Sequence, residues 1–298
     1  MSGVWYGVAA YSLWGLLTLY WRLFPQVPAI QILAHRFVWS FVVLAVLIAA
    51  SWRRRRTVLQ TIDRRIIGVY AIAAVLIGVN WFLYVFSVNN GYVVESSLGY
   101  FMTPLVNVLM GVVVFRERLR SMQWLAVACA FLGVLWLAVA YGALPWIGLA
   151  LAASFGSYGL VKKKARLPAL EGLWLETAAL MLPAALYLAV LDRSGAGAFL
   201  HSRLSTDLLL AASGIVTVVP LLLFATAVRR VPLSVIGILQ YIAPTIQFLL
   251  GVYAFREPFT RAQLTGFGLV WLGLVVFTLD GVRSRALPSL APVAEGVR

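Results

Sequence analysis

The segment PLVNVLMGVVVFRE, residues 104–117, returns as PTIQFLLGVYAFRE, residues 244–257, and this pair decides the fold. The two segments share a proline at the first position, a glycine at the eighth and Phe-Arg-Glu at the end. Each belongs to a longer apolar run, and a helix needs about 20 such residues to cross a bilayer. The sequence therefore contains one membrane-crossing unit twice.

The repeat extends from these segments in both directions. Downstream, at the same offset, the matches are Gln123 with Gln263 and Gly133 with Gly273. Upstream, at an offset one residue longer, they are Gly7 with Gly148 and Gly15 with Gly156. Each half holds five apolar runs, and because five is odd, the second copy must enter the membrane in the reverse sense. Inverted repeats of this kind are typical of alternating-access transporters, whose binding site lies near the midplane between the copies.

The composition supports a membrane protein. Hydrophobic residues make up 62% of the 298 residues and charged residues only 11%, against about 45–50% and 25% in soluble domains. A soluble enzyme, a disordered chain and a fibrous protein are excluded, and we expect an all-α integral membrane protein. Ten spans are expected, at residues 4–22, 31–51, 66–88, 93–115, 121–140, 145–161, 173–191, 208–228, 233–255 and 262–281.

The basic residues predict the orientation of the chain. Its net charge is +14, and most Lys and Arg fall in connections on one side, as in Arg53–Arg56 and Lys162–Lys164. By the positive-inside rule, that side is cytoplasmic and holds both termini. Topology accounts for these charges, so nucleic acid is not an expected partner. Cys129, the single cysteine, permits neither an intrachain disulfide nor a multi-cysteine metal site.

The predicted organisation is two five-helix repeats around a central cavity. The first repeat covers residues 1–143 and the second, inverted repeat residues 144–283, with a short cytoplasmic tail at 284–298. Pro104 and Pro244 fall in the middle of equivalent spans, where each removes a backbone hydrogen bond and can kink its helix. Paired kinks suit helices that bend around a cavity. Membrane helices also tolerate proline without functional consequence.

The motifs within the spans resemble those of the drug/metabolite transporter superfamily, in its EamA-type branch, and in particular the RarD-like permeases. They are Leu33-Ala34-His35-Arg36, Gly78-Val79-Asn80-Trp81, Glu95–Phe101, Pro104–Asn107, Gly159–Lys164 and Gln240–Thr245. The resemblance implies a ten-helix permease of the inner membrane that exports drugs or metabolites. Similar proteins include exporters of aromatic amino acids and of threonine, and the RarD label is associated with chloramphenicol sensitivity.

Polar and aromatic residues inside the spans are the candidates for lining the cavity, because polar groups there are costly unless they serve a function. Arg36 suits a substrate carboxylate, although it could also extend to the outer interface. Many of the rings could equally anchor the protein at the membrane interfaces. The candidates are Trp14, His35, Arg36, Asn80, Trp81, Tyr84, Ser97, Tyr100, Tyr158, Gln240 and Tyr241.

Three titratable residues are candidates for proton coupling: His35, Glu95 and Glu176. Glu95 also suits the positive end of a helix dipole, and Glu176 could simply be a helix-end residue near the cytoplasm. Glu117 and Glu257, at the ends of the repeated segments, are interpreted as structural. None of these residues forms a metal-binding pattern, and no metal is expected.

These observations predict a carrier that exports small amphipathic metabolites by alternating access, with amino acids, including aromatic ones, as the expected substrates. The alternative is a drug efflux permease, for example for phenicols, coupled to proton antiport. No His-Glu-x-x-His, Gly-x-Ser-x-Gly or phosphate-binding Gly-x4-Gly-Lys-Ser/Thr occurs, so neither an enzyme nor ATP is expected. A cofactor is not expected either. The partners are a small solute and membrane lipid, and a monomer is compatible with this function.

Overall fold

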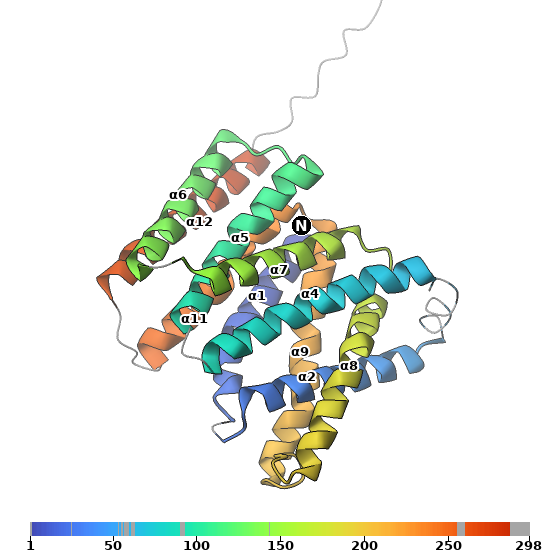
Figure 1. Cartoon of the computed structure of the whole chain (residues 1–298). Coiled ribbons are helices and arrows are strands. Elements are labelled where there is room, and N and C mark those ends of the chain that lie inside the picture. The colour runs from blue at the N-terminus through green and yellow to red at the C-terminus, as the bar shows by residue number, and fades with distance from the viewer. Residues whose placement is uncertain are drawn as a thin grey trace, which may run out of the picture.

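The computed structural model describes residues 2–24, 26–52, 54, 56, 60, 63–89, 93–142, 144–254 and 260–286. Across these ranges the chain is helical, with no β-strand (Figure 1). The helices are α1 Ser2–Trp21, α2 Ala29–Ala49, α4 Arg64–Asn89, α5 Val93–Phe115, α6 Ser121–Tyr141, α7 Trp146–Lys164, α8 Ala169–Arg193, α9 Leu204–Arg230, α10 Leu233–Gln240, α11 Ile242–Leu249, the π-helical turn η1 Leu250–Ala254, and α12 Arg261–Ala286.

Within these ranges, eight helical segments are long and apolar enough to cross a membrane. They are Ala29–Ala49, Arg64–Tyr84, Leu98–Phe115, Ser121–Tyr141, Ala169–Arg193, Leu204–Arg230, Leu233–Ala254 and Arg261–Gly281. The two other predicted spans, 4–22 and 145–161, are helices here, α1 and α7, but they are not among the eight. The sequence of α7 explains this for one of them: it holds several glycines and serines and ends in three lysines, which lower its mean hydropathy.

The helices pack in pairs that follow the sequence repeat. Helix α5 packs on α7 as α10 and α11 pack on α1, and α2 packs on α9 as α4 packs on α8. The pairs α6–α12, α2–α8 and α5–α10 each join one helix of the first half to its equivalent in the second. In Figure 1, α6 and α12 lie side by side at one edge of the molecule. If each helix in these pairs is replaced by its equivalent in the other half, the same set of pairs results.

Small residues permit the closest of these approaches. A Cβ atom on Gly133 of α6 would lie 2.7 Å from the carbonyl oxygen of Gly266, and one on Gly273 of α12 would lie 2.6 Å from that of Ala126. The two contacts are equivalent under the repeat. Glycine at such positions lets membrane helices pack backbone against backbone, so α6 and α12 meet at a distance that no larger residue allows.

The backbone around the two repeated prolines differs. Helix α5 stays helical through Pro104. In the second half, the α-helix is interrupted at Tyr241, between α10 and α11, and Pro244 follows three residues later. Proline has no N–H to donate to the carbonyl of the residue four positions earlier, here Gln240. The interruption therefore lies where the missing hydrogen bond would have been.

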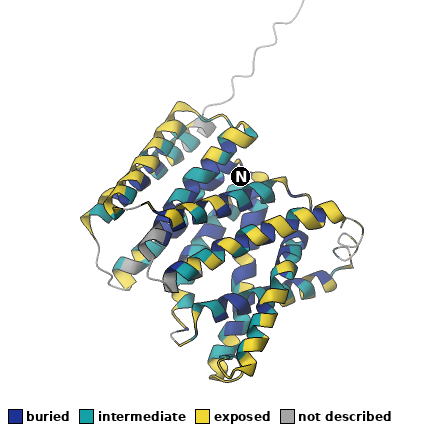
Figure 2. Ribbon diagram, viewed as in Figure 1, coloured by how far each residue is buried: buried dark blue, intermediate teal, exposed yellow. Residues whose placement is uncertain are grey.

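Burial divides the helices into an inner and an outer face. Buried residues gather where helices meet, and exposed residues cover the outside (Figure 2). Large apolar side chains lie on that outside, with Phe82 56%, Leu186 59% and Val139 69% exposed. Water-soluble monomers rarely expose such continuous apolar surface. The outer face is thus suited to lipid.

Candidate functional site

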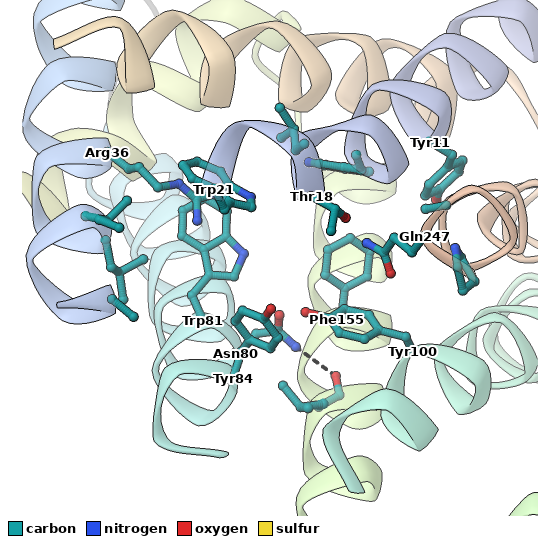
Figure 3. Close-up of a pocket in the computed structure, with 18 of the residues that line it drawn as sticks. Tyr11, Thr18, Trp21, Arg36, Asn80, Trp81, Tyr84, Tyr100, Phe155 and Gln247 are labelled. Atoms are coloured by element: carbon teal, nitrogen blue, oxygen red, sulfur yellow. Dashed lines mark hydrogen bonds between the residues drawn. The ribbon is translucent and has the colours of Figure 1, made fainter. Parts of the chain in front are cut away.

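A cavity of about 450 Å³ lies between the two halves. That volume is typical of sites for small organic ligands. The cavity is lined mainly by rings and aliphatic side chains of α1, α2, α4, α5, α7, α10 and α11 (Figure 3). Its lining residues include Tyr11, Trp14, Thr18, Trp21, Arg22, Arg36, Asn80, Trp81, Tyr84, Tyr100, Thr103, Phe155, Gln240 and Gln247.

Arg36 of α2 provides a fixed positive charge in this cavity. Its guanidinium carbon lies 4.6 Å from the ring centroid of Trp21 and 4.1 Å from that of Trp81, within the range of cation–π attraction. Its Nε donates a hydrogen bond to Thr217 Oγ1 at 3.0 Å. Figure 3 shows the two indoles beside the guanidinium. Two rings and one hydroxyl thus set the orientation of the cation.

Apart from Arg22, the other polar groups of the described cavity lining are neutral. Asn80 Nδ2 donates to the carbonyl oxygen of Leu151 at 2.9 Å and to Ser154 Oγ at 3.0 Å, so its amide holds α4 against α7. The rings of Tyr84 and Tyr100 meet edge to face, 5.8 Å apart. Among the lining residues that the structure describes, none is Asp or Glu. The described part of the lining is therefore apolar and aromatic with a net positive charge.

An aromatic cluster borders the cavity between α1, α7 and α9. Trp14 lies 6.1 Å from Phe155 and 5.6 Å from Phe224, and Tyr158 stacks on Phe224 at 6.0 Å. Tyr158 and Phe224 are fully buried. Edge-to-face and offset contacts of this kind add to the stability that burial provides. The cluster closes the cavity on this side.

A buried ion pair, Lys162–Glu176, lies next to the aromatic cluster. Lys162 Nζ is 2.7 Å from Glu176 Oε1, and Tyr158 donates its hydroxyl hydrogen to Glu176 Oε2 at 2.9 Å. The two charged side chains are only 3% and 2% exposed. Removing one partner of such a pair leaves an uncompensated buried charge, which is strongly destabilising. The pair therefore ties α7 firmly to α8.

The structure brings most of the predicted lining residues together. Those that line the cavity are Trp14, Arg36, Asn80, Trp81, Tyr84, Tyr100 and Gln240. The side chains of Ser97 and Glu95, and all of Glu257, lie outside the described residues.

Three predicted lining residues lie elsewhere. His35 is buried with its ring 5.3 Å from Phe199 in the connection between α8 and α9, because neighbouring residues on a helix point about 100° apart and Arg36 takes the cavity side. Tyr158 contacts Glu176 instead. Tyr241 is buried, and its hydroxyl donates to the carbonyl oxygen of Phe101 at 3.2 Å.

Sequence reasoning assigned no cavity role to Trp21, Thr18, Gln247 or Thr217. Gln247 had a usable signal, because it matches Asn107 in the repeat. Lys162 was interpreted only as a topology signal in a basic run, yet it is buried in an ion pair. Helical phase is the reason: Lys164, two residues further along α7, is exposed.

Glu117 lies in the connection after α5 and holds the start of α10. Its carboxylate accepts hydrogen bonds from the N–H groups of Leu233 and Ser234, at 2.7 and 2.9 Å, and from Ser234 Oγ at 2.7 Å. A carboxylate at a helix N-terminus also interacts favourably with the helix dipole. Burial alone would raise the pKa of Glu117, but these hydrogen bonds and nearby Lys163 outweigh it and hold the pKa below its usual value. Its place is structural, as the sequence suggested.

The comparisons with known proteins agree with this architecture. The EamA-like transporter family matches residues 1–139 and again residues 144–279. The chain is 49% identical over 285 residues to Protein RarD of Streptomyces exfoliatus, which covers 95% of this chain and 90% of that protein. It is 30% identical over 289 residues to the chloramphenicol-sensitive protein RarD of Pseudomonas aeruginosa, covering 95% of each.

A solved crystal structure of another protein shares the fold. It superposes with a TM-score of 0.69 at 22% identity and covers 95% of this chain and 99% of that one. Two family matches span nearly the whole chain, and a relative of similar length is 49% identical. The resemblance seen in the sequence motifs is thus confirmed: the chain belongs to the EamA-like transporter family, as a RarD-like permease of the drug/metabolite transporter superfamily.

Proposed function

We propose that this chain is an inner-membrane carrier that exports small amphipathic metabolites by alternating access. The proposed substrates are amino acids, including aromatic ones. In this proposal, ten helices cross the membrane as two inverted five-helix repeats, residues 1–143 and 144–283, and both termini are cytoplasmic. Alternating access in such folds comes from rocking one repeat against the other around a central site.

Three observations support the inverted repeat. The family model matches twice, the most extensive helix pairs are unchanged when the halves are exchanged, and equivalent glycines make equivalent contacts. The last point extends to α1 and α7: a Cβ on Gly15 would lie 2.7 Å from Ile246 Cβ, and one on Gly156 would lie 2.5 Å from Val106 Cγ1. An odd number of helices per copy then requires opposite insertion.

One observation carries the proposal: the cavity combines aromatic walls with an arginine, Arg36, that two indoles and a hydroxyl hold in place. Rings bury the apolar body of a solute, and a few polar groups fix its orientation. Arg36 offers N–H groups to a negatively charged end, and Trp81, Tyr84 and Tyr100 offer faces and edges to an apolar body. An amphipathic metabolite such as an aromatic amino acid combines a negatively charged carboxylate at one end with an apolar ring at the other.

The orientation of the chain assigns a direction to the cavity. With the N-terminus in the cytoplasm, the end of α1 and the connection to α2 lie on the outer side. Trp21, Phe24 and Val27 from this region line the cavity, whereas the ion pair Lys162–Glu176 lies toward the end of α7 that faces the cytoplasm in this topology. In this proposal the cavity faces the outside and is separated from the cytoplasm by the ion pair and the aromatic cluster.

Solute counterflow in proteoliposomes tests this function. Liposomes loaded with one unlabelled amino acid should accumulate the same labelled amino acid from outside, with aromatic amino acids among the best substrates. Arg36→Gln should abolish the accumulation, whereas Arg193→Gln, on an exposed residue, should leave it unchanged. If no amino acid exchanges while chloramphenicol does, the proposed substrate class is wrong.

The second candidate is phenicol efflux driven by proton antiport, and a relative named for chloramphenicol sensitivity favours it. Proton coupling needs a titratable group that the solute or the transition can reach. Glu176 is paired with Lys162, and His35 packs against Phe199, which favours facilitated export without coupling. An imposed pH gradient that accelerates chloramphenicol efflux, and no longer does so in Glu176→Gln or Glu95→Gln, would establish the alternative.

A further inference from the structure

The charge of Arg36 has no protein counter-ion among the described residues. Its only hydrogen bond to a described residue is the one from Nε to neutral Thr217. The two acids beside the connection between α8 and α9 have partners of their own: Asp192 Oδ1 lies 2.9 Å from His201 Nε2, and Asp207 accepts a hydrogen bond from the N–H of Leu200 at 3.0 Å. A charged side chain within a membrane-spanning segment, here without a counter-ion among the described residues, is a candidate functional site by default.

The fixed orientation of Arg36 limits what can satisfy it. The indoles of Trp21 and Trp81 occupy the faces of the guanidinium, and Thr217 takes Nε. Neither terminal nitrogen donates a hydrogen bond to a described residue, and their fork matches the two oxygens of a carboxylate. Because the rings hold the fork in place, little side-chain freedom is lost when the carboxylate binds.

An ammonium group would find a poorer site in the same cavity. The described lining residues contain no carboxylate, and a buried ion without a counter-ion pays a large desolvation cost. The neutral acceptors there are partly engaged: Gln240 Oε1 already accepts a hydrogen bond from Asn107 Nδ2 at 2.7 Å. Ring faces can attract an ammonium group, but Arg36 itself already lies against Trp21 and Trp81.

We propose that the pocket recognises the carboxylate alone, so that its preferred ligands are small aromatic monocarboxylates without an ammonium group. This class includes 2-oxo acids, aryl-alkanoic acids and N-acylated amino acids. The inference rests on the proposed function, because it takes the cavity as the solute site. It adds a charge preference: monoanions bind better than zwitterionic amino acids, and amines are excluded.

Three probes with one skeleton test the charge preference directly. They are 3-phenylpropionate, L-phenylalanine and 2-phenylethylamine, which carry the carboxylate alone, both groups and the ammonium alone. Their binding to the purified full chain in nanodiscs is measured by calorimetry at neutral pH. We expect 3-phenylpropionate to bind about tenfold more tightly than phenylalanine, since an unsatisfied polar group costs about 1–3 kcal/mol, and we expect no measurable binding of the amine.

Two arginine variants locate the effect. Arg36→Gln should reduce the affinity for 3-phenylpropionate at least tenfold and make the three probes nearly equal. Arg36→Lys keeps the charge without the fork and should retain the order of the probes at lower affinity. Unchanged affinity in Arg36→Gln, in a variant that elutes as a folded monodisperse protein, overturns the inference.

Glu95 provides the most direct way to contradict the preference. If its carboxylate served as the partner of a solute ammonium group, phenylalanine would bind more tightly than 3-phenylpropionate, and Glu95→Gln would reverse that order. That result rejects the charge preference and leaves amino-acid export standing. If none of the three probes binds and none exchanges in counterflow, the proposed function fails together with it.

Discussion

Arg36 in α2 and Glu176 in α8 occupy equivalent positions of the two repeats, yet their surroundings differ. Arg36 lies between two indoles at an open cavity, whereas Glu176 is buried in an ion pair with Lys162. The residues beside them are equivalent too, because Trp21 matches Lys162 at the offset that relates Gly15 to Gly156. One half of the repeat thus provides its own counter-charge. Arg36 in the other half has none among the described residues, and in our proposal a ligand supplies it.

In the proposed transport cycle, this difference gives the two similar halves different roles. Where the protein supplies both charges, the helices are held together without a solute. Where it supplies one charge, closure over the cavity leaves a cation unpaired unless an anion is present. Substitutions at Arg36 and at the Lys162–Glu176 pair test this difference.

The largest expected effect is on stability, at Lys162. Lys162→Met leaves Glu176 as an unpaired buried charge, which costs about 3–5 kcal/mol. Arg36→Gln should cost little or even stabilise the protein, because Arg36 has no ion-pair partner among the described residues. Thermal unfolding in detergent, followed by tryptophan fluorescence, measures both.

Two further variants serve as controls for this prediction. Lys164→Met, two residues away and exposed, should leave the unfolding temperature unchanged. Adding Glu176→Gln to Lys162→Met should recover much of the loss, because no charge then stays buried. If Arg36→Gln destabilises the protein as much as Lys162→Met does, the two sites do not differ in the way described.

A smaller effect is expected at Thr217, which joins the two sites. Its hydroxyl accepts the hydrogen bond from Arg36 Nε, and its side chain also borders a small cavity next to Glu176. Thr217→Val keeps the shape but removes the acceptor, so the guanidinium loses its alignment. We expect about fivefold weaker solute binding, which corresponds to the loss of one ordinary hydrogen bond of about 1 kcal/mol.

Thr226→Val is the matched control for Thr217→Val. Thr226 lies on the same helix and donates only to the carbonyl oxygen of Leu222, at 2.7 Å, in the bonds described here. Solute affinity measured in parallel should be that of the unchanged protein. A loss of folded protein with no change in affinity for Thr217→Val would mean that Thr217 supports packing rather than the orientation of Arg36.

The smallest effect is expected at Glu117, at the membrane edge beside Lys163. The pKa of Glu117 is lower in the folded protein than its usual value, so its contribution to stability is present above the unfolded pKa and is lost as the pH falls through the folded pKa. Glu117→Gln should therefore cost about 1 kcal/mol at neutral pH, the typical value of a helix cap. The difference from the unchanged protein should shrink below about pH 4.

Unfolding temperatures of both proteins between pH 7 and pH 3.5 measure this dependence. Gln123→Glu, in the first turn of α6 and away from the α10 contacts, serves as the comparison for a general effect of charge. A constant difference across this range would show that Glu117 acts through packing and not through its charge.

The sequence was sufficient to identify the apolar runs, the repeat and the residues whose polarity conflicts with their place in a membrane helix. That reasoning found Arg36, Asn80, Tyr84 and Tyr100, all of which line the cavity. It did not separate neighbours on one helix, because a rotation of about 100° per residue decides which of His35 and Arg36 meets the cavity.

Contacts between distant helices were the other limit. Nothing near Lys162 in the sequence distinguishes it from the exposed Lys164, and the ion pair exists only because α8 brings Glu176 to α7. Trp21 and Thr217 likewise gain their roles from Arg36, which lies on a different helix from either. Such pairings depend on how the helices pack, and a single sequence does not state that.

The interruption at Tyr241 has a mechanical consequence. Before Tyr241 in the chain, α10 is held to the first half by Glu117. After Tyr241, the α11 residues Ala243, Pro244 and Gln247 line the cavity. A continuous helix would transmit a tilt along its whole length. Because Pro244 cannot donate a hydrogen bond to the carbonyl of Gln240, this helix bends more easily at that point. Its second part can therefore tilt toward the cavity while the first part keeps its contact with Glu117.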